Sequence, residues 1–366
     1  MKLKKRSIAI PLFFIKHGKV GGAEEMAYNL IEGLCVNSEV ALFIHNEEDL
    51  SKNFLSFCRE NKIKIFKQKK IFNRFFSELT FPLLHYKKSF SLLLHMNYFM
   101  TPFSYLMSKK VFTIIHDLQY LHFPENFSLI KRLWLFICHN VSMLFSTKVI
   151  AISDYVLNDI KEKYFYIPFK RIFRLYNSVD FSEVDLEENT ISFKEPFLLC
   201  IAANYKHKNI KVLIRAFLNS NLSKSHKLVL VGQSSKKLVG SHVRDDNLSS
   251  TEDENIIFTG YISELEKKMY LKNCEIFCFP SLFEGFGMPI IEALSFKKPV
   301  LCSDIPVLRE ISLDSCTFID DPKNVTSWIE AFNNLNLCKS KVLKDTDKLL
   351  AKYDKETIAK ELLSEI

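Results

Sequence analysis

The stretch FCFPSLFEGFGMPIIEALSFKKPVLCSD, residues Phe277–Asp304, divides into a strand, a loop, a helix and a second strand. The first apolar run ends at Pro280, and two glycines mark the loop that follows it. Pro289 suits the first turn of a helix that is expected to run to about Phe296. Pro299 then blocks continuation of the helix before the next apolar run. This order of elements is the repeating unit of a parallel α/β sheet.

The same rhythm recurs along the whole chain as short β-branched or aromatic runs, loops and longer amphipathic stretches. In the first half the expected strands are residues 7–15, 39–45, 91–95, 111–115 and 148–152, with a glycine loop at 18–22 and a helix at 23–34. In the second half the expected strands are residues 197–202, 227–231, 256–258, 275–279, 299–302 and 317–319. The pattern predicts an α/β protein with two Rossmann-like sheets.

The length of 366 residues exceeds the ~100 to 200 residues of a usual domain, so two domains are expected. We place an N-terminal domain at residues 1–181 and a C-terminal domain at 196–350. Residues 182–195 between them are rich in acids and are the expected linker. Residues 351–366 are expected to form a C-terminal helix that packs back on the N-terminal domain.

The loop and helix of the opening stretch have the chemistry of a phosphate and sugar site. Loops at the carboxyl ends of parallel strands face the ligand crevice, and a helix start favours anions. A diphosphate is therefore expected at residues 287–290, where glycine lets the backbone approach closely. Glu284 in the loop and Glu292 on the helix offer carboxylates that accept hydrogen bonds from sugar and ribose hydroxyls.

At these residues the chain resembles the retaining family 4 glycosyltransferases of the GT-B fold. Their mark is two glutamates separated by seven residues in the setting PSxxEGFGxPxxEA, which is matched here by Pro280, Ser281, Glu284, Gly285, Phe286, Gly287, Pro289, Glu292 and Ala293. The resemblance implies two Rossmann-like domains whose parallel sheets face each other across a cleft. It also implies a nucleotide-diphosphate sugar as co-substrate, without another cofactor and without a metal.

The resemblance implies a role for each matching residue of the second half. Glu284 would contact the donor sugar, Glu292 the ribose, and the backbone from Phe286 to Met288 the sugar and diphosphate. Lys208, in the pair Lys-Asn after a strand, would neutralise the diphosphate. Tyr261 is either a wall on which the base stacks or a core tyrosine. With the first half included, the predicted donor-binding residues are Gly21, Gly22, Lys208, Tyr261, Glu284, Gly285, Phe286, Gly287, Met288, Pro289 and Glu292.

The first half contributes two further segments to the resemblance. In KHGKVGGAEEMAYNLIEGL, Gly21 and Gly22 match the glycine loop under the donor phosphates, and Glu24 either faces the acceptor or caps the helix. In VFTIIHDLQYLHFPE, His116 ends a strand, where the resemblance implies contact with the donor sugar. Asp117 beside it is an expected acceptor-side group. The predicted catalytic residues are thus His116, Glu284 and Lys208.

Positive charge is concentrated between residues 61 and 116. The whole chain has a net charge of +8, yet this stretch alone holds ten Lys or Arg against the single acid Glu78. Aromatic residues such as Phe66 and Phe75 are interleaved with the bases. Either the segment lies on an anionic lipid surface, or it is a solvated basic face with core aromatics beneath. A nucleic-acid partner is not expected, because no binding motif accompanies the charge.

The location and metal content follow from less specific features. Nine scattered cysteines and no signal peptide favour reduced thiols in the cytoplasm, with peripheral association at the inner face of the plasma membrane. The apolar run Leu133–Phe145 is shorter than the ~20 residues of a membrane span and is expected as a buried or interfacial helix. The only D-x-D, Asp345–Asp347, lies far from the donor motifs and is interpreted as solvated helix surface.

The expected activity is that of a retaining, metal-independent hexosyltransferase. Its acceptor would be a glycan or lipid-linked glycan in the synthesis of bacterial surface polysaccharide, namely O-antigen, capsule or lipopolysaccharide. Two alternatives stay open: a catalytically silent GT-B scaffold or partner subunit of a glycosyltransferase complex, and a GT-B sugar-nucleotide epimerase. The silent scaffold gains some support from Ala202, which stands where many relatives have an additional arginine.

Overall fold

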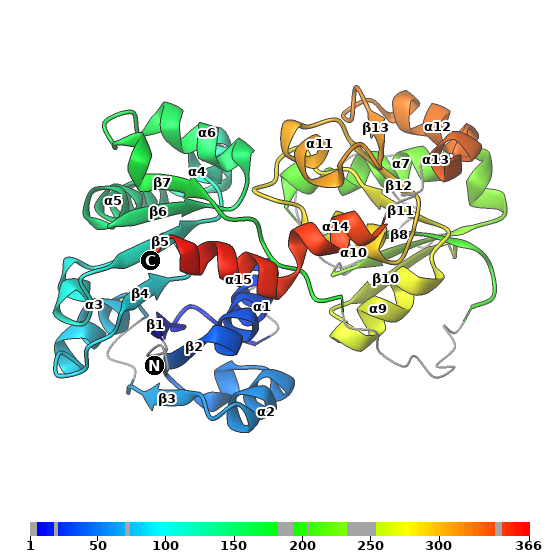
Figure 1. Cartoon of the computed structure of the whole chain (residues 1–366). Helices are drawn as coiled ribbons and strands as arrows, with labels where there is room; N and C mark the ends of the chain where they lie inside the picture. The colour runs from blue at the N-terminus through cyan, green and yellow to red at the C-terminus, as the bar shows by residue number, and fades with distance from the viewer. Residues whose placement is uncertain are drawn as a thin grey trace. The chain divides into compact units, whose positions relative to one another are not determined.

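The chain forms two compact units, each built on its own parallel sheet (Figure 1). The computed structural model describes residues 6–17, 21–69, 74–181, 193–203, 205–232, 254–340 and 346–366. Unit 1 comprises Met1–Asp180 and Ala351–Ile366, and unit 2 comprises Phe181–Leu350. Most of the predicted linker, residues 182–192, lies outside the described residues.

The sheet of unit 1 has seven strands in the order β3-β2-β1-β4-β5-β6-β7, and every pairing is parallel. The strands are β1 (Arg6–Pro11), β2 (Ser38–Ile44), β3 (Lys64–Lys67), β4 (Leu92–His95), β5 (Val111–Ile115), β6 (Lys148–Ala151) and β7 (Ile172–Arg174). The five predicted strands are present, whereas β3 and β7 were not predicted. β1 is shorter than predicted because the chain turns after Pro11, where the Ile15 amide donates to the Leu12 carbonyl at 3.0 Å.

Helices flank this sheet, and the last one returns from the end of the chain. They are α1 (Gly22–Asn37), α2 (Lys52–Glu60), α3 (Arg74–Leu84), α4 (Gln119–His122), α5 (Leu129–Phe145), α6 (Asp154–Lys163) and α15 (Lys355–Ser364). α15 packs closely on α1 at Gly33, where a Cβ would lie 2.1 Å from the Lys355 carbonyl oxygen. Lys355 Nζ also donates to Glu32 Oε2 at 2.7 Å, so the C-terminal helix belongs to unit 1.

The sheet of unit 2 has six parallel strands in the order β10-β9-β8-β11-β12-β13. They are β8 (Phe197–Ile201), β9 (Lys227–Val231), β10 (Ile256–Gly260), β11 (Ile276–Phe279), β12 (Val300–Ser303) and β13 (Thr317–Ile319), and all six were predicted. The helices are α7 (Ile210–Leu218), α9 (Glu264–Asn273), α10 (Met288–Ser295), α11 (Pro306–Ser312), α12 (Val325–Asn333), α13 (Leu335–Ser340) and α14 (Thr346–Tyr353). Phe217 on α7 and Trp328 on α12 are fully buried in one core.

Both sheets reverse their strand order at one place. β1 pairs with β4 in unit 1, and β8 pairs with β11 in unit 2, although neither pair is consecutive in the chain. Open parallel sheets bind ligands beyond the carboxyl ends of the strands at such a reversal. The loops after β1 and β4, and those after β8 and β11, are therefore the expected ligand loops. The predicted α/β fold with Rossmann-like sheets is confirmed for each unit taken by itself.

Some aromatic residues of the basic stretch, Phe66 and Phe75 among them, pack inward, whereas Phe76, Tyr86, Phe103 and Tyr105 are 41–57% exposed. The Phe66 ring on β3 stacks on Phe43 of β2 with centroids 5.1 Å apart, and Phe75 meets Trp134 edge-on at 4.5 Å. For Phe66 and Phe75, the interpretation as core aromatic residues beneath a solvated basic face is correct. Residues 70–73 lie outside the described chain. None of the described helices is long and apolar enough to cross a membrane.

Candidate functional site

Lys208 and Glu284 meet at the reversal of strand order in unit 2. Lys208 ends the 3₁₀ turn Lys206–Lys208 after β8, and Glu284 lies in the loop between β11 and α10. Lys208 Nζ donates to Glu284 Oε1 at 2.6 Å, and their side chains are only 17% and 12% exposed. Charges so withdrawn from water interact more strongly than a surface pair does. The predicted phosphate-binding lysine and sugar-binding glutamate thus form one group.

The backbone of the two loops is joined as well. The Leu282 amide donates to the carbonyl oxygen of buried His207 at 2.7 Å. Asn209 then begins α7 in the left-handed conformation, with φ of 55°, which asparagine tolerates better than most residues. Its side-chain amide donates to the Pro322 carbonyl at 2.7 Å. These bonds hold Lys208 in register with the β11 loop.

The loop before α10 packs against α11 at Gly287, which has no side chain. Gly287 has φ of +102°, and a Cβ would lie 2.8 Å from Leu308 Cδ2 on α11. The segment Gly285–Met288 is buried, and Pro289 lies in the first turn of the helix, as predicted. Within the described chain, no side chain caps this helix start. Pro289 has no N–H and the Ile290 amide donates to the Gly287 carbonyl at 3.0 Å, so the positive end of the helix dipole is the feature that suits a phosphate group here.

Glu292 lies further along α10 with one carboxylate oxygen satisfied and one not. Lys267 Nζ on α9 donates to Glu292 Oε1 at 3.1 Å. Glu292 Oε2 is buried and has no hydrogen-bond partner within the described part of the chain. An unsatisfied buried polar atom costs about 1–3 kcal/mol, so a ligand hydroxyl at Oε2 would recover a hydrogen bond. Lys267 was not among the predicted residues, since nothing in SELEKKMY distinguishes it from its neighbour Lys268.

Tyr261 follows β10 at the edge strand of the same sheet. Its side chain is 77% exposed, so the alternative of a core tyrosine is wrong. An exposed ring after a parallel strand remains suited to stacking on a base.

His116 lies at the end of β5 in unit 1, the predicted position. Its Nε2 is 2.8 Å from the carbonyl oxygen of Met96, which directly follows β4. A carbonyl oxygen only accepts, so Nε2 carries the proton and Nδ1 is an acceptor. Burial lowers the pKa of His116 and keeps the ring neutral. This form can accept a hydrogen bond from a sugar hydroxyl.

Asp117 and Glu24, the predicted acceptor-side residues, both have partners of their own. Asp117 Oδ1 accepts from the Gln119 amide at 2.9 Å, at the start of α4. Glu24 is buried in the first turn of α1, where Oε1 accepts from His17 Nδ1 and from the Tyr28 hydroxyl, each at 3.0 Å. Burial raises the pKa of Tyr28, so its hydroxyl keeps the proton that it donates. Local structure accounts for these contacts, and the acceptor-side role stays a prediction.

Gly21 precedes α1 with φ of 66° and ψ of −137°, a conformation that favours glycine. A Cβ there would meet no atom within 4 Å, so the backbone is open to a ligand on this side. Gly22 is the first residue of α1, while residues 18–20 of the glycine loop lie outside the described chain. Since β1, β4 and β5 are neighbours, this loop and His116 lie at the same edge of the sheet.

The described residues contain no group of three or more His, Cys, Asp or Glu side chains placed to hold a metal ion. In the D-x-D motif Asp345–Asp347, Asp347 is exposed in the first turn of α14, and Asp345 lies outside the described residues. The nine cysteines are free, and eight of them are buried.

Two family models match consecutive parts of the chain. "Glycosyltransferase Family 4" matches residues 20–183, and "Glycosyl transferases group 1" matches residues 182–356. The chain belongs to the family 4 glycosyltransferases. In this glycosyltransferase the two matches meet at the residues where the structure divides into unit 1 and unit 2.

Relatives of this glycosyltransferase include enzymes named for surface glycans. The O-antigen chain mannosyltransferase RfbU of Salmonella typhimurium is 27% identical over 243 residues, which are 66% of this chain and 64% of RfbU. The N-acetylgalactosamine-N,N'-diacetylbacillosaminyl-diphospho-undecaprenol 4-alpha-N-acetylgalactosaminyltransferase of Campylobacter jejuni is 26% identical over 306 residues, 78% of each chain. The match to RfbU therefore spans less than two thirds of that protein's length.

Solved structures share the two-domain arrangement of sheets. Anabaena HepE in complex with UDP-glucose has a TM-score of 0.72 at 15% identity, covering 99% of this chain and 100% of HepE. At this identity the similarity concerns the fold, which is GT-B.

Proposed function

We propose that this glycosyltransferase moves a hexose-type sugar from a nucleotide-diphosphate donor to a glycan or lipid-linked glycan acceptor, with retention of the anomeric configuration. The observation that carries the proposal is the Lys208–Glu284 pair at the reversal of strand order, next to the uncapped start of α10. The names of RfbU and the Campylobacter jejuni enzyme support a role in bacterial surface polysaccharide. That role predicts a cytoplasmic protein at the inner face of the plasma membrane.

Each donor group has a complementary partner in unit 2. The Lys208 ammonium has three N–H donors, so it can bind a diphosphate oxygen while it still holds Glu284. The second Glu284 oxygen then accepts from a sugar hydroxyl. Glu292 Oε2, which is buried and unpartnered in the described chain, accepts from a ribose hydroxyl. The positive end of the α10 dipole adds further attraction for the diphosphate.

In the reaction, the bond between the anomeric carbon and the donor phosphate oxygen breaks. The acceptor hydroxyl oxygen forms its bond to that carbon on the same face. The departing phosphate oxygen takes the hydroxyl proton, so the step needs neither a carboxylate nucleophile nor a metal. Lys208 stabilises the charge that develops on the diphosphate, which is the largest kind of catalytic effect available to such a site. Neutral His116 orients the sugar through Nδ1.

The donor test is a panel of nucleotide sugars that is screened for a rise in unfolding temperature. A bound donor raises stability in proportion to the logarithm of its concentration over Kd. The donor found in this way is then incubated with and without an acceptor glycan. Turnover only with acceptor, giving a product whose anomeric proton coupling matches that of the donor, is the expected result. An inverted product would exclude retention.

The same incubation separates the two alternatives. A sugar-nucleotide epimerase would convert the donor without acceptor, and a silent scaffold would bind or ignore it without any turnover. Treatment with EDTA is expected to leave the transfer rate unchanged. Loss of the rate with EDTA and its return with Mn²⁺ would overturn the metal-independent mechanism.

A further inference from the structure

Helix α5 of unit 1 exposes an apolar face that its own fold does not use. Its sequence LIKRLWLFICHNVSMLF contains two bases and no acid. Leu129, Ile130 and Leu133 are 77%, 84% and 62% exposed, and Phe136 and Ile137 on the following turn are about half exposed. The outer face of a helix at a protein surface is normally polar. A contiguous row of large apolar side chains marks an interaction surface.

The opposite side of α5 is anchored, so the helix cannot rotate to bury its outer face. The buried His139 ring stacks on Tyr98 with centroids 5.0 Å apart, and Ser142 Oγ donates to the Tyr98 carbonyl at 2.6 Å. At the C-terminal end, Arg171 donates to the Met143 carbonyl at 2.9 Å. The helix therefore has an inner apolar face that is fixed in unit 1 and an outer apolar face that is exposed. The outer face would be removed from water only by contact with another apolar surface.

We propose that the outer face of α5, Leu129–Ile137, docks on an anionic phospholipid bilayer. Lys131 and Arg132 lie among the apolar residues, and no acid on the helix opposes them. Aliphatic and aromatic side chains together with bases are the composition of helices that lie in a membrane interface. A protein partner would fit this surface less well, because lysine is depleted from protein interfaces. With 17 residues, α5 is about 25 Å long and lies in the interface without crossing it.

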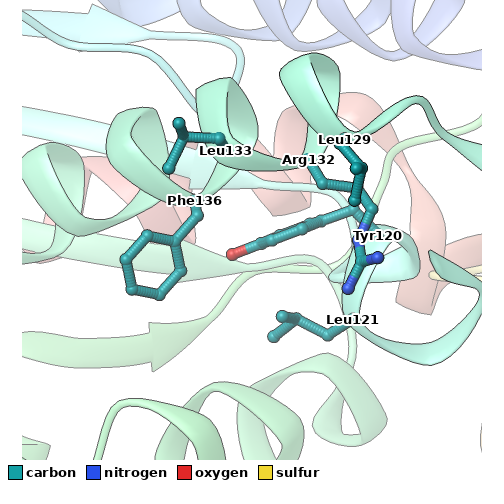
Figure 2. Close-up of a pocket in the computed structure, with 6 residues that line it drawn as sticks. All are labelled: Tyr120, Leu121, Leu129, Arg132, Leu133 and Phe136. Atoms are coloured by element: carbon teal, nitrogen blue, oxygen red, sulfur yellow. The ribbon is translucent and has the colours of Figure 1, made fainter.

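A groove beside α5 connects this face to the acceptor-side segment. A pocket of about 290 Å³ lies between α4 and α5, and its lining is Tyr120, Leu121, Leu129, Arg132, Leu133 and Phe136 (Figure 2). Figure 2 shows the Tyr120 ring extending toward Phe136, with the Arg132 guanidinium at the other end. Arg132 is the charged member of this lining and suits a lipid phosphate. α4 begins three residues after His116, so docking here brings the bilayer to the acceptor side of unit 1.

This docking surface differs from the basic stretch of residues 61–116 in how far its apolar side chains are exposed. Phe66 and Phe75 of that stretch pack within unit 1. Its exposed apolar residues, such as Leu84, reach 57%, whereas Leu129 and Ile130 of α5 reach 77% and 84%. Charge alone attracts a protein to a surface within a Debye length, whereas apolar side chains hold it there. The inference deepens the proposed function, since a lipid-linked acceptor lies in a membrane. It does not require the transfer reaction to be the one proposed.

The test is sedimentation of the full chain with phosphatidylcholine vesicles, with and without phosphatidylglycerol. The double variant Ile130→Gln and Leu133→Gln should bind about tenfold more weakly or worse, because two inserted aliphatic groups are lost. Lys131→Gln should weaken binding only to the anionic vesicles, by about fivefold. The matched control is Leu83→Gln with Leu84→Gln on α3, whose side chains are 41% and 57% exposed in the same unit. It should bind like the unmodified chain.

Tryptophan fluorescence gives a second readout that identifies the helix in contact with lipid. The chain has two tryptophans: Trp134 lies on α5, and Trp328 is fully buried in unit 2. Brominated lipids should quench the fluorescence of the unmodified chain, and Trp134→Phe should abolish the quenching while sedimentation persists. Quenching that survives in Trp134→Phe would overturn the assignment to α5.

Two further results would overturn the proposal. One is equal vesicle binding by the α5 variant and the α3 control. The other is light scattering that shows a dimer which the α5 variant alone dissociates, with no vesicle binding, because the face would then join two copies of the chain. Transfer of sugar to a soluble acceptor is measured in parallel on each variant. A failure of docking with transfer intact is thus distinguished from a failure of the proposed function.

Discussion

Lys267 on α9 holds one oxygen of Glu292 on α10 at 3.1 Å, and the other oxygen of Glu292 is buried without a partner in the described chain. The Lys267 side chain is 12% exposed and that of Glu292 is 8% exposed. The hydrogen bond from the ammonium fixes the orientation of the buried carboxylate. If Glu292 binds the ribose as proposed, Lys267 is a positioning residue that acts on the nucleotide through Glu292.

Replacing Lys267 should weaken nucleotide binding without touching the sugar-binding residues. In Lys267→Met the carboxylate of Glu292 loses its charged partner, and we expect the Kd for the nucleoside diphosphate to rise about tenfold, the effect of one charged hydrogen bond. Isothermal titration calorimetry with the nucleoside diphosphate measures this. Lys267→Arg should restore binding, and Lys272→Met, an exposed lysine of the same helix, should change nothing. Equal affinities in Lys267→Met and Lys272→Met would remove the positioning role.

The Lys208–Glu284 contact predicts that two substitutions distinguish binding of the nucleotide from binding of the sugar. Lys208→Met should raise the Kd of the nucleoside diphosphate by about 10- to 100-fold, since a charge-assisted hydrogen bond is worth about 1.5–3 kcal/mol. Glu284→Gln should leave that Kd within a few fold but remove the extra affinity for the matching nucleotide sugar. The double variant should lose less binding free energy for the nucleotide sugar than the sum of the losses in the two single variants, because the two residues are in direct contact. Additive losses would show that the 2.6 Å contact does not couple them.

The elements of unit 2 could be predicted because their signals are local. Pro280, Pro289 and Pro299 delimit one loop and one helix within a single stretch, and the structure places α10 at Met288–Ser295 accordingly. β3 and β7 in unit 1 were missed for the opposite reason. They are four and three residues long, and β3 has two half-buried apolar residues between two exposed lysines, which resembles a solvated basic segment.

The site could be predicted residue by residue but not as an arrangement. Lys208 and Glu284 are 76 positions apart, and their contact follows from the pairing of β8 with β11, which the sequence does not state. Lys267 was missed because it becomes special only when α9 packs beside α10. The apolar run of α5 was recognised as buried or interfacial, yet only its side-chain exposure shows that it is apolar on both sides.

The glycine at position 287 should be irreplaceable, unlike the one at position 21. In Gly287→Ala, the positive φ and the 2.8 Å approach to Leu308 both cost free energy, together about 2–4 kcal/mol of unit 2 stability. Urea unfolding in a Trp134→Phe background reports unit 2 through Trp328. Gly21→Ala, which meets no atom, should cost unit 1 only conformational strain of about 1–2 kcal/mol. A Gly287→Ala protein as stable as its parent would mean that α11 yields to the added methyl group.

Unit 1 should lose stability as the pH falls below 6.5, because burial holds His95, His116 and His139 in the neutral form. Burial lowers the pKa of His95 to about 3 and that of His139 to about 4, from 6.5 in the absence of burial. The unfolded chain therefore takes up protons first, and each histidine costs about 1.4 kcal/mol of the free energy of unfolding per pH unit below 6.5. The stability that each neutral histidine contributes is fully present above pH 6.5. It is lost progressively as the pH falls from 6.5 to the pKa of that histidine in the folded protein.

Hydrogen exchange read by mass spectrometry can follow this loss in peptides of unit 1 and unit 2 separately. His139 lies on the buried side of α5, stacked on Tyr98, so its share should appear as smaller protection factors of α5 between about pH 6.5 and pH 5, after correction for the pH dependence of the intrinsic exchange rate. In His139→Gln the pH dependence of unit 1 should decrease without disappearing, because His95 and His116, whose pKa values are also lowered by burial, still take up protons on unfolding. A slope unchanged by this substitution would show that protonation of other groups, such as carboxylates, controls the acid stability of unit 1.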